Sequence, residues 1–165
     1  MPDGVIGTGI GAGVKRVEDF RFLTGNGNYT DDINRPGQTY AYMLRSPHAH
    51  ATINSIDTAD AEAAQGVVAV FTGDDMQVGG LPCGWQIHSE DGSPMHEPTH
   101  PSLAQGKVRH VGDQVAVVIA ETLEQEKTAA TLINIDYGIL PAVMDMKSAE
   151  AGGTLVHEEI ETNKC

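Results

Sequence analysis

Hydrophobic and polar positions between residues 39 and 72 follow the pattern of a small unit of strands and one helix. Two segments have the length and composition of strands, a third is a continuous apolar run, and an alanine-rich stretch lies between them. Asp57 and Thr58 offer an N-cap to that stretch, and Gly66 ends it. The pattern predicts strands over Tyr40–Arg45, Ala51–Ile56 and Val67–Thr72, and a helix over Ala59–Gln65.

The same order of elements returns after residue 106. Thr122 can cap a stretch of high helix propensity, and the apolar run before it is rich in Val and Ile. Two similar strand-strand-helix-strand halves predict an α+β fold, although the halves share no sequence repeat. The predicted elements are strands over Lys107–Val111, Val115–Ala120 and Ile133–Tyr137, a helix over Thr122–Leu132 and a short final helix over Lys147–Ala151.

The elements define one domain over residues 39–157, with a long loop at 73–106. Loops of that length are commonly functional or interfacial. Residues 1–38 are rich in Gly, Asn and Asp, and they predict an extended N-terminal arm. Turns are expected in this arm at Gly25-Asn26-Gly27 and Pro36-Gly37.

The composition fits a single folded domain with a core of small aliphatic side chains. The chain has 165 residues, of which 40% are hydrophobic but only 5% aromatic. The core must therefore come from Val, Ile, Ala and Leu. The net charge of −13 repels phosphate backbones and anionic membrane surfaces, so we expect no nucleic-acid partner.

The sequence shows neither a signal peptide nor a membrane span. The start, MPDGVIGTGIG, lacks a basic and an apolar region, and apolar residues nowhere run together for about 18 positions. Cys83 and Cys165 are too far apart for a disulfide framework or a CxxC metal site. These features predict a cytoplasmic protein.

Gly7-Thr8-Gly9-Ile10-Gly11-Ala12 fits the GxGxxG/A fingerprint of dinucleotide-binding proteins. That motif needs a strand before it and a helix after it, so that the helix N-terminus faces the pyrophosphate. Only six residues precede it here. We interpret it as part of the arm and expect no nucleotide to bind there.

His96-Glu97-Pro98-Thr99-His100 fits the HExxH pattern of zinc proteases. The chemistry needs both histidines on one helical face, with the glutamate as base. Pro98 lies inside the would-be helix, where a proline costs about 3 kcal/mol. We therefore predict no metal site, although a zinc hydrolase that uses His96, Glu97 and His100 remains an alternative that is easy to test.

His48 and His50 could form a metal pair on an extended strand, but no Asp, Glu or Cys follows them at ligand spacing. A structural role is the favoured interpretation. Arg45, at a strand end, can clamp a carboxylate or backbone carbonyls. We predict that Arg45–Ala51 ties parts of the domain together or contacts a neighbour.

The acidic pairs Asp31-Asp32 and Asp74-Asp75 are interpreted as solvated turn residues. Cys83, beside Trp85 in Pro82-Cys83-Gly84-Trp85, would need a histidine base to act as a nucleophile, and packing or interface burial is the favoured role. The sequence therefore assigns no catalytic, cofactor-binding or metal-ligating residue to this chain.

Five ordered segments nevertheless carry a family resemblance: GAGVKRVEDFRFLTGNGNYTDDI, YMLRSPHAHATINSIDT, GVVAVFTGDDM, HPSLAQGKVRHVGDQVAVVIAET and INIDYGILPAVMD. Together they resemble the N-terminal domain of molybdenum hydroxylase large subunits, the family of xanthine dehydrogenase, aldehyde oxidase and aerobic carbon monoxide dehydrogenase. The resemblance runs from Gly9 to His157. Pro82-Cys83-Gly84-Trp85 is most similar to the carbon monoxide dehydrogenase type. The fold that the resemblance implies is an α/β-hammerhead.

The resemblance also implies a larger enzyme. Large subunits of this family bind molybdopterin cytosine dinucleotide with molybdenum, and they act with a [2Fe-2S] subunit and an FAD subunit. They hydroxylate a substrate carbon with oxygen from water, or they oxidise CO to CO2. The molybdenum-binding segments and the catalytic glutamate of the family lie downstream of the resembling region. We expect this chain alone to bind no cofactor, and residues 158–165 to begin a link to molybdenum-binding domains.

The leading hypothesis is a structural domain that scaffolds the molybdenum domains and the iron–sulfur subunit and is inactive alone. The N-terminal arm and Gly79–Pro101 are the expected contact surfaces. A domain without its neighbours is expected to self-associate through uncovered apolar patches. The alternative is a stand-alone binding or assembly module without catalytic activity.

Overall fold

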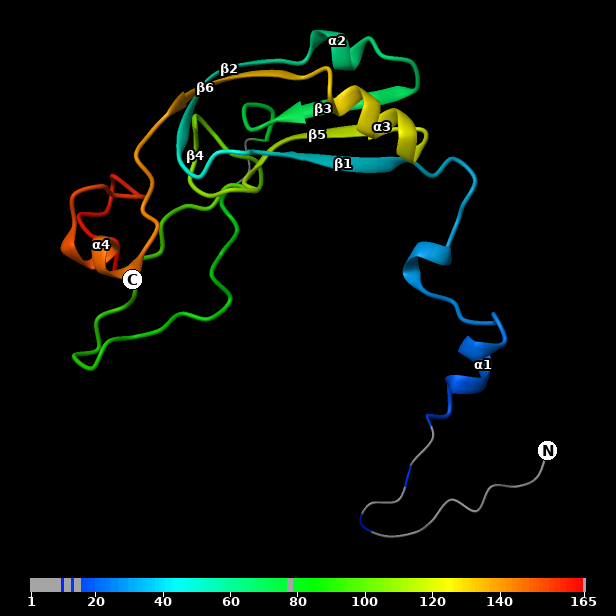
Figure 1. The fold of residues 1–165 in the computed structure, drawn as a ribbon, viewed down its shortest axis with the longest axis horizontal. Coiled ribbons are helices and arrows are strands. Elements are labelled where there is room, and N and C mark those ends of the chain that lie inside the picture. The colour runs from blue at the N-terminus through cyan, green and yellow to red at the C-terminus, as the bar shows by residue number, and fades with distance from the viewer. Residues whose placement is uncertain (1–9, 11–12, 14–15, 77–78, 165) are drawn as a thin grey trace. The chain divides into compact units, whose positions relative to one another are not determined.

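The computed structural model describes residues 10, 13, 16–76 and 79–164, and its elements follow the predicted order (Figure 1). The chain divides into two compact units, residues 1–38 and residues 39–165. The smaller unit contains helix α1 (Asp19–Leu23) and a 3-10 helix (Thr30–Asp32), so its described part is not extended throughout. The turns predicted in it are present, with positive φ angles of 74° at Gly25 and 76° at Gly37.

Two antiparallel three-stranded sheets form the larger unit, as expected for the predicted α+β hammerhead. Each half of the chain contributes the middle strand of the sheet that the other half builds. Strand β5, from the second half, lies between β1 and β3, and β2, from the first half, lies between β4 and β6. The strands are β1 (Tyr40–Arg45), β2 (Ala51–Asp57), β3 (Val67–Thr72), β4 (Lys107–Val108), β5 (Gln114–Ala120) and β6 (Asn134–Ile139).

The core is built from small side chains, as the composition predicts. Helices α2 (Ala59–Glu62) and α3 (Leu123–Ala130) pack on the β1–β5–β3 sheet. Ala61 and Ala129 meet Ala116 and Val118 in this cluster, where all four are fully buried. Alanines at the contact let helix and strand backbones approach closely. A second cluster joins the two sheets and contains Ala51, Ala104, Val108 and Val115.

The strand predicted over Lys107–Val111 ends early, at Val108. The backbone N–H of Arg109 turns to the Asp113 carboxylate, 3.0 Å away, and leaves the ladder. Gly112 then has a φ of 88°, which a strand cannot continue through. The prediction missed this turn because the valines at 108 and 111 favour a strand in composition, whereas the turn depends on a contact with Asp113.

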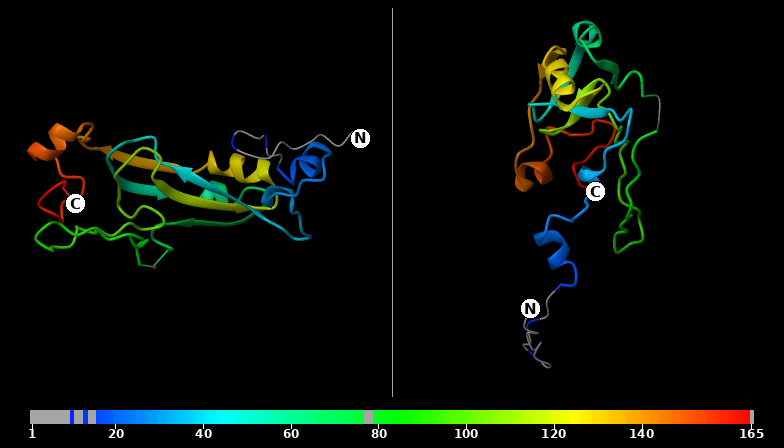
Figure 2. Two further views of the ribbon diagram at one scale, coloured as in Figure 1. Left: turned by 90° about the horizontal axis from the view of Figure 1, so that it is seen from below. Right: turned by 90° about the vertical axis from the view of Figure 1, so that its right-hand side faces the viewer.

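The long loop projects away from the sheets, and its far end lies beside the C-terminal segment (Figures 1 and 2). Between residues 79 and 101 its regular pairing is a single bridge, His88 to Pro94. Helix α4 (Met146–Ala151) belongs to the C-terminal segment. None of the helices in the described part of the chain has the length and hydrophobicity that crossing a bilayer requires.

Gly73→Ala is expected to destabilise the larger unit. A Cβ at Gly73 would overlap the carbonyl oxygen of Ala104. Ala104 is 4% exposed and its N–H donates to the Gln114 carbonyl at 2.6 Å, so it has no room to move. We expect the free energy of unfolding to fall by about 1–3 kcal/mol in urea denaturation. Gly84→Ala is the control, because nothing lies within 4 Å of a Cβ there; equal effects of the two variants would contradict the packing.

Acid is expected to fray the start of α4. The Asp145 carboxylate caps this helix by accepting the N–H groups of Lys147 and Ser148, both at 3.0 Å. Hydrogen bonds from Ser148, and more weakly from Lys147, lower the pKa of Asp145. A lowered pKa makes the cap fully effective above the ordinary Asp pKa of about 3.9, and the cap is lost as the pH falls through the folded-state value. Amide chemical shifts of Lys147 and Ser148 should report this change. Asp145→Asn, which caps without titrating, should remove it; a persisting transition would contradict the assignment.

Candidate functional site

The segment Arg45–Ala51 ties the end of β1 to a neighbouring turn. The Arg45 guanidinium donates to the Gly112 carbonyl at 2.8 Å. Ser46 and Gly112 extend the tie, because the Ser46 N–H donates to the Asp113 carbonyl and the Gly112 N–H donates to the Ser46 carbonyl, both at 2.8 Å. The predicted role of Arg45 as a clamp on a backbone carbonyl is confirmed, and the clamp lies within the domain.

The two histidines of this segment have different partners. Nδ1 of His50 lies 2.7 Å from the Pro141 carbonyl, and because a carbonyl only accepts, Nδ1 carries the proton. His50 is 6% exposed. The His48 ring packs edge-on against Tyr137, with ring centres 4.9 Å apart. Burial, and secondarily the charge of Asp113, raises the pKa of the Tyr137 hydroxyl. These contacts fit the predicted structural role and not a metal pair.

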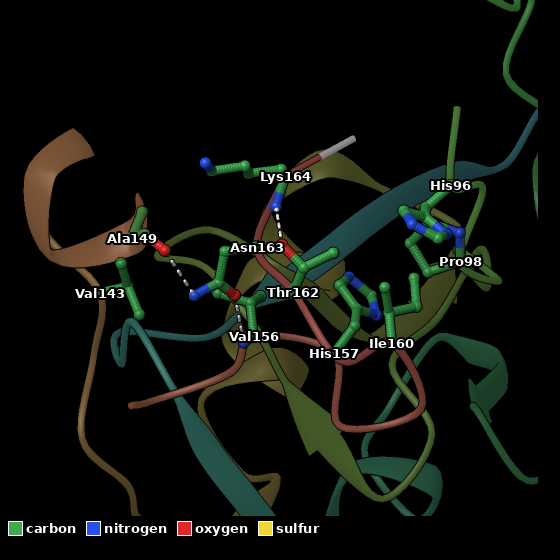
Figure 3. A pocket seen from close by; sticks show the side chains of 10 residues that line it. All are labelled: His96, Pro98, Val143, Ala149, Val156, His157, Ile160, Thr162, Asn163 and Lys164. Atoms are coloured by element: carbon green, nitrogen blue, oxygen red, sulfur yellow. Dashed lines mark hydrogen bonds between the residues drawn. The ribbon is translucent and has the colours of Figure 1, made fainter. Parts of the chain in front are cut away.

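A cavity of about 310 Å³ lies between the long loop and the C-terminal segment (Figure 3). Asn163 organises its wall: its amide Nδ2 donates to the carbonyl of Thr154 at 2.9 Å, and its Oδ1 accepts the N–H of Val156 at 3.0 Å. The lining residues are His96, Pro98, Val143, Ala149, Val156, His157, Ile160, Thr162, Asn163 and Lys164.

A second cavity, of about 270 Å³, adjoins the first at Val156 and His157. Its basic groups hold the C-terminal segment in place. Lys107 Nζ lies 2.8 Å from a Glu158 oxygen and lowers the pKa of that carboxyl. Arg109 Nε donates to the Val156 carbonyl at 3.1 Å. Because these cations bind groups of the same chain, the cavity is not built as an anion site.

The HExxH residues do not converge. Residues 95–100 form no helix; His96 lines the first cavity, whereas His100 stacks on His110 in the second, with ring centres 6.2 Å apart. Glu97 accepts the Cys83 N–H and the Gln86 amide, both at 2.6 Å. Across the described ranges, no group of three or more His, Cys, Asp or Glu side chains is placed to hold a metal ion.

The acidic pairs make local contacts. Asp31 and Asp32 belong to the 3-10 helix, where Asp32 accepts the Tyr29 N–H at 2.8 Å. Asp75 accepts the N–H and the hydroxyl of Thr72, and these bonds lower the pKa of its carboxyl. Asp32 and Asp75 are therefore more than the solvated turn residues that the sequence predicted. The GxGxxG/A residues lie outside the described residues, apart from Ile10.

The Cys83 thiol is exposed and lies 3.3 Å from the Trp85 carbonyl. Trp85 is itself 82% exposed. The suggestion that this pair packs inside the domain is therefore wrong, and interface burial remains a prediction. Sequence reasoning also missed Lys107 and Arg109 as anchors of the C-terminal segment. Their partners lie more than 40 positions away in the chain, and no local pattern signals such a contact.

Comparison with known families gives a match over residues 24–141 to the model described as aldehyde oxidase and xanthine dehydrogenase, a/b hammerhead domain. The chain is 36% identical over 154 residues to the carbon monoxide dehydrogenase large chain of Afipia carboxidovorans. It is 38% identical, also over 154 residues, to the nicotine 6-hydroxylase large subunit of Paenarthrobacter nicotinovorans. Both alignments cover 93% of this chain but 18% of the relative.

Solved structures similar to this chain are oxidoreductases, as the relatives found by sequence are. Quinoline 2-oxidoreductase from Pseudomonas putida 86 superposes with a TM-score of 0.80 at 38% identity, over 90% of this chain and 19% of that one. A Cu,Mo-CO dehydrogenase superposes with a TM-score of 0.74 at 36% identity, over 89% of this chain and 18% of that one. The chain thus spans less than a fifth of the length of these relatives.

Proposed function

Because the chain belongs to the aldehyde oxidase and xanthine dehydrogenase family and carries its a/b hammerhead domain, we propose that it works as a structural domain of a molybdenum-containing oxidoreductase large subunit. In this proposal it supports the molybdenum-binding part of that subunit and the docking of an iron–sulfur subunit. The whole enzyme would oxidise CO or hydroxylate an aldehyde or a purine-type ring, and electrons would pass to a flavin subunit.

One observation carries the proposal: the charged and titratable side chains that were candidates for a functional role make hydrogen bonds within the domain. Arg45 clamps a carbonyl, His50 donates to a carbonyl, and Lys107 holds the C-terminal segment. A scaffold needs such ties, whereas a catalytic site needs free groups around a substrate.

The family's cofactor does not fit the residues described. Molybdopterin cytosine dinucleotide would need a cradle for its phosphates, and the Lys and Arg side chains that line the two cavities already have partners in the chain: Lys107 binds Glu158, Arg109 the Val156 carbonyl and Lys164 Glu150. No described residue is therefore assigned to the cofactor. Its molybdenum chemistry, with iron–sulfur and FAD groups on partner subunits, is proposed for the rest of the enzyme.

The molybdenum content and the activity of the isolated chain, compared with those of the full-length enzyme, test the proposal. The 165-residue chain, purified alone, should contain no molybdenum and should oxidise neither CO nor aldehydes. The full-length product of the same gene, purified with its partner subunits, should contain molybdenum and should oxidise CO or hydroxylate an aldehyde or a purine-type ring. Activity of the isolated chain would overturn the proposal, and a gene that ends at Cys165 without a molybdenum-enzyme neighbour would favour a stand-alone assembly module.

A further inference from the structure

The β1–β5–β3 sheet has one apolar face that the domain covers only in part. Cross-strand partners share a face. The register aligns Met43 with Val117 and Phe71 in one row, and Ala41 with Ile119 and Ala69 in the next. We call these six residues the outer face. The opposite face packs under α2 and α3, with Tyr42, Val118 and Val70 in the core cluster.

The outer face lacks the polar residues that a solvated sheet face carries. In an antiparallel sheet with one solvent-exposed face, apolar and polar residues alternate along each strand. The strand β5 instead reads QVAVVIA, which is typical of a strand buried on both sides. Yet Met43 is 39% exposed and Phe71 is 38% exposed. The sequence of β5 is therefore that of a strand in a middle layer, whereas the domain covers its second side only in part: Val115 is buried, but Val117 and Ile119 are half-buried.

We propose that the outer face is the surface on which the rest of the large subunit packs, as an apolar layer against β1, β5 and β3. This inference rests on the proposed function and adds to it the surface that makes the contact. The chain spans 18% of the length of its curated relatives, so most of such a subunit lies elsewhere and is available to cover the face.

Charge favours this occupant over a second copy of the chain. Each copy carries a net charge of −13, and the outer face holds no cation to offset the repulsion between two copies. Its alanines and Val117 leave a flat surface on which a helix or a sheet from a different sequence can pack closely.

A charge on the outer face tests the inference in the full-length large subunit. Phe71→Asp would bury an unpaired carboxylate at the contact. We expect the yield of large subunit that co-purifies with its partner subunits and molybdenum to fall by at least about ten-fold. Leu132→Asp is the matched control, because Leu132 is also 38% exposed but lies outside the outer face; its yield should stay within about two-fold of wild type.

The isolated chain separates the possible outcomes. Phe71→Asp should leave the isolated chain with a cooperative thermal transition and lower its free energy of unfolding by no more than about 2 kcal/mol, so that a ten-fold loss in the full-length protein reports assembly and not folding. Wild-type yield of the Phe71→Asp enzyme would overturn this inference and leave the proposed function intact. Dimerisation of the isolated chain through this face would only reflect its exposure; if instead the full-length large subunit paired with a second copy and Phe71→Asp abolished that pair without lowering the yield of assembled enzyme, the occupant would be a second copy, which also overturns the inference. A gene encoding no larger subunit would overturn the proposed function itself.

Discussion

Val118→Asp is expected to leave the chain without a cooperative unfolding transition. Val118 has no exposed surface and lies in the middle strand of its sheet, in the cluster that includes Ala61 and Ala129. Burying an unpaired carboxylate costs several kcal/mol even after relaxation, and a domain of this size is stable by only about 5–15 kcal/mol.

Val68→Asp is the control for this variant. Val68 lies on β3 of the same sheet but is 59% exposed, so its carboxylate stays hydrated. We expect Val68→Asp to unfold within about 1 kcal/mol of wild type, as followed by circular dichroism during heating. A sharp transition of normal enthalpy in Val118→Asp would show that the core is not where the structure places it.

His50→Ala has the second-largest expected effect, a loss of about 2–4 kcal/mol in the free energy of unfolding. The substitution removes a buried ring and leaves the Pro141 carbonyl without its donor. The backbone bond from the Leu140 N–H to the His50 carbonyl, at 3.0 Å, is kept in the variant, so the loss measures the side-chain tie between the start of β2 and the chain after β6.

His48→Ala separates the two histidines. Its ring contacts Tyr137 edge-on, and such aromatic pairs contribute about 0.5–1.5 kcal/mol. Urea denaturation of both variants gives the comparison. If His48→Ala were the more damaging, the buried hydrogen bond of His50 would not be the main tie of this segment.

Local patterns predicted the elements well because each carries its own signal. The apolar run of β3 and the Thr122 cap that accepts the Gln125 N–H at 3.3 Å are such signals. The helix predicted over Ala59–Gln65 is an exception, because α2 ends at Glu62, before Gly66. The exchange of β2 and β5 between the two sheets could not be predicted in this way, because strand pairing depends on contacts between distant residues.

The same limit applies to the candidate site. Arg45 was predictable as a clamp from its position at a strand end. The anchoring of Val156 and Glu158 by Arg109 and Lys107 was not, because it joins segments that only the fold brings together. The exposure of Cys83 beside the 82% exposed Trp85 was not predictable either, because it depends on where the long loop lies in the fold.

The most direct test of the central claim is the size of the native protein in its source cell. An antibody raised against this segment would detect it on a denaturing gel, and molybdenum would be measured in the fractions it marks. A band several times larger than the 17.5 kDa of this chain, co-eluting with molybdenum, is the result expected of a hammerhead domain in an oxidoreductase large subunit. A band near 17.5 kDa in molybdenum-free fractions would contradict it.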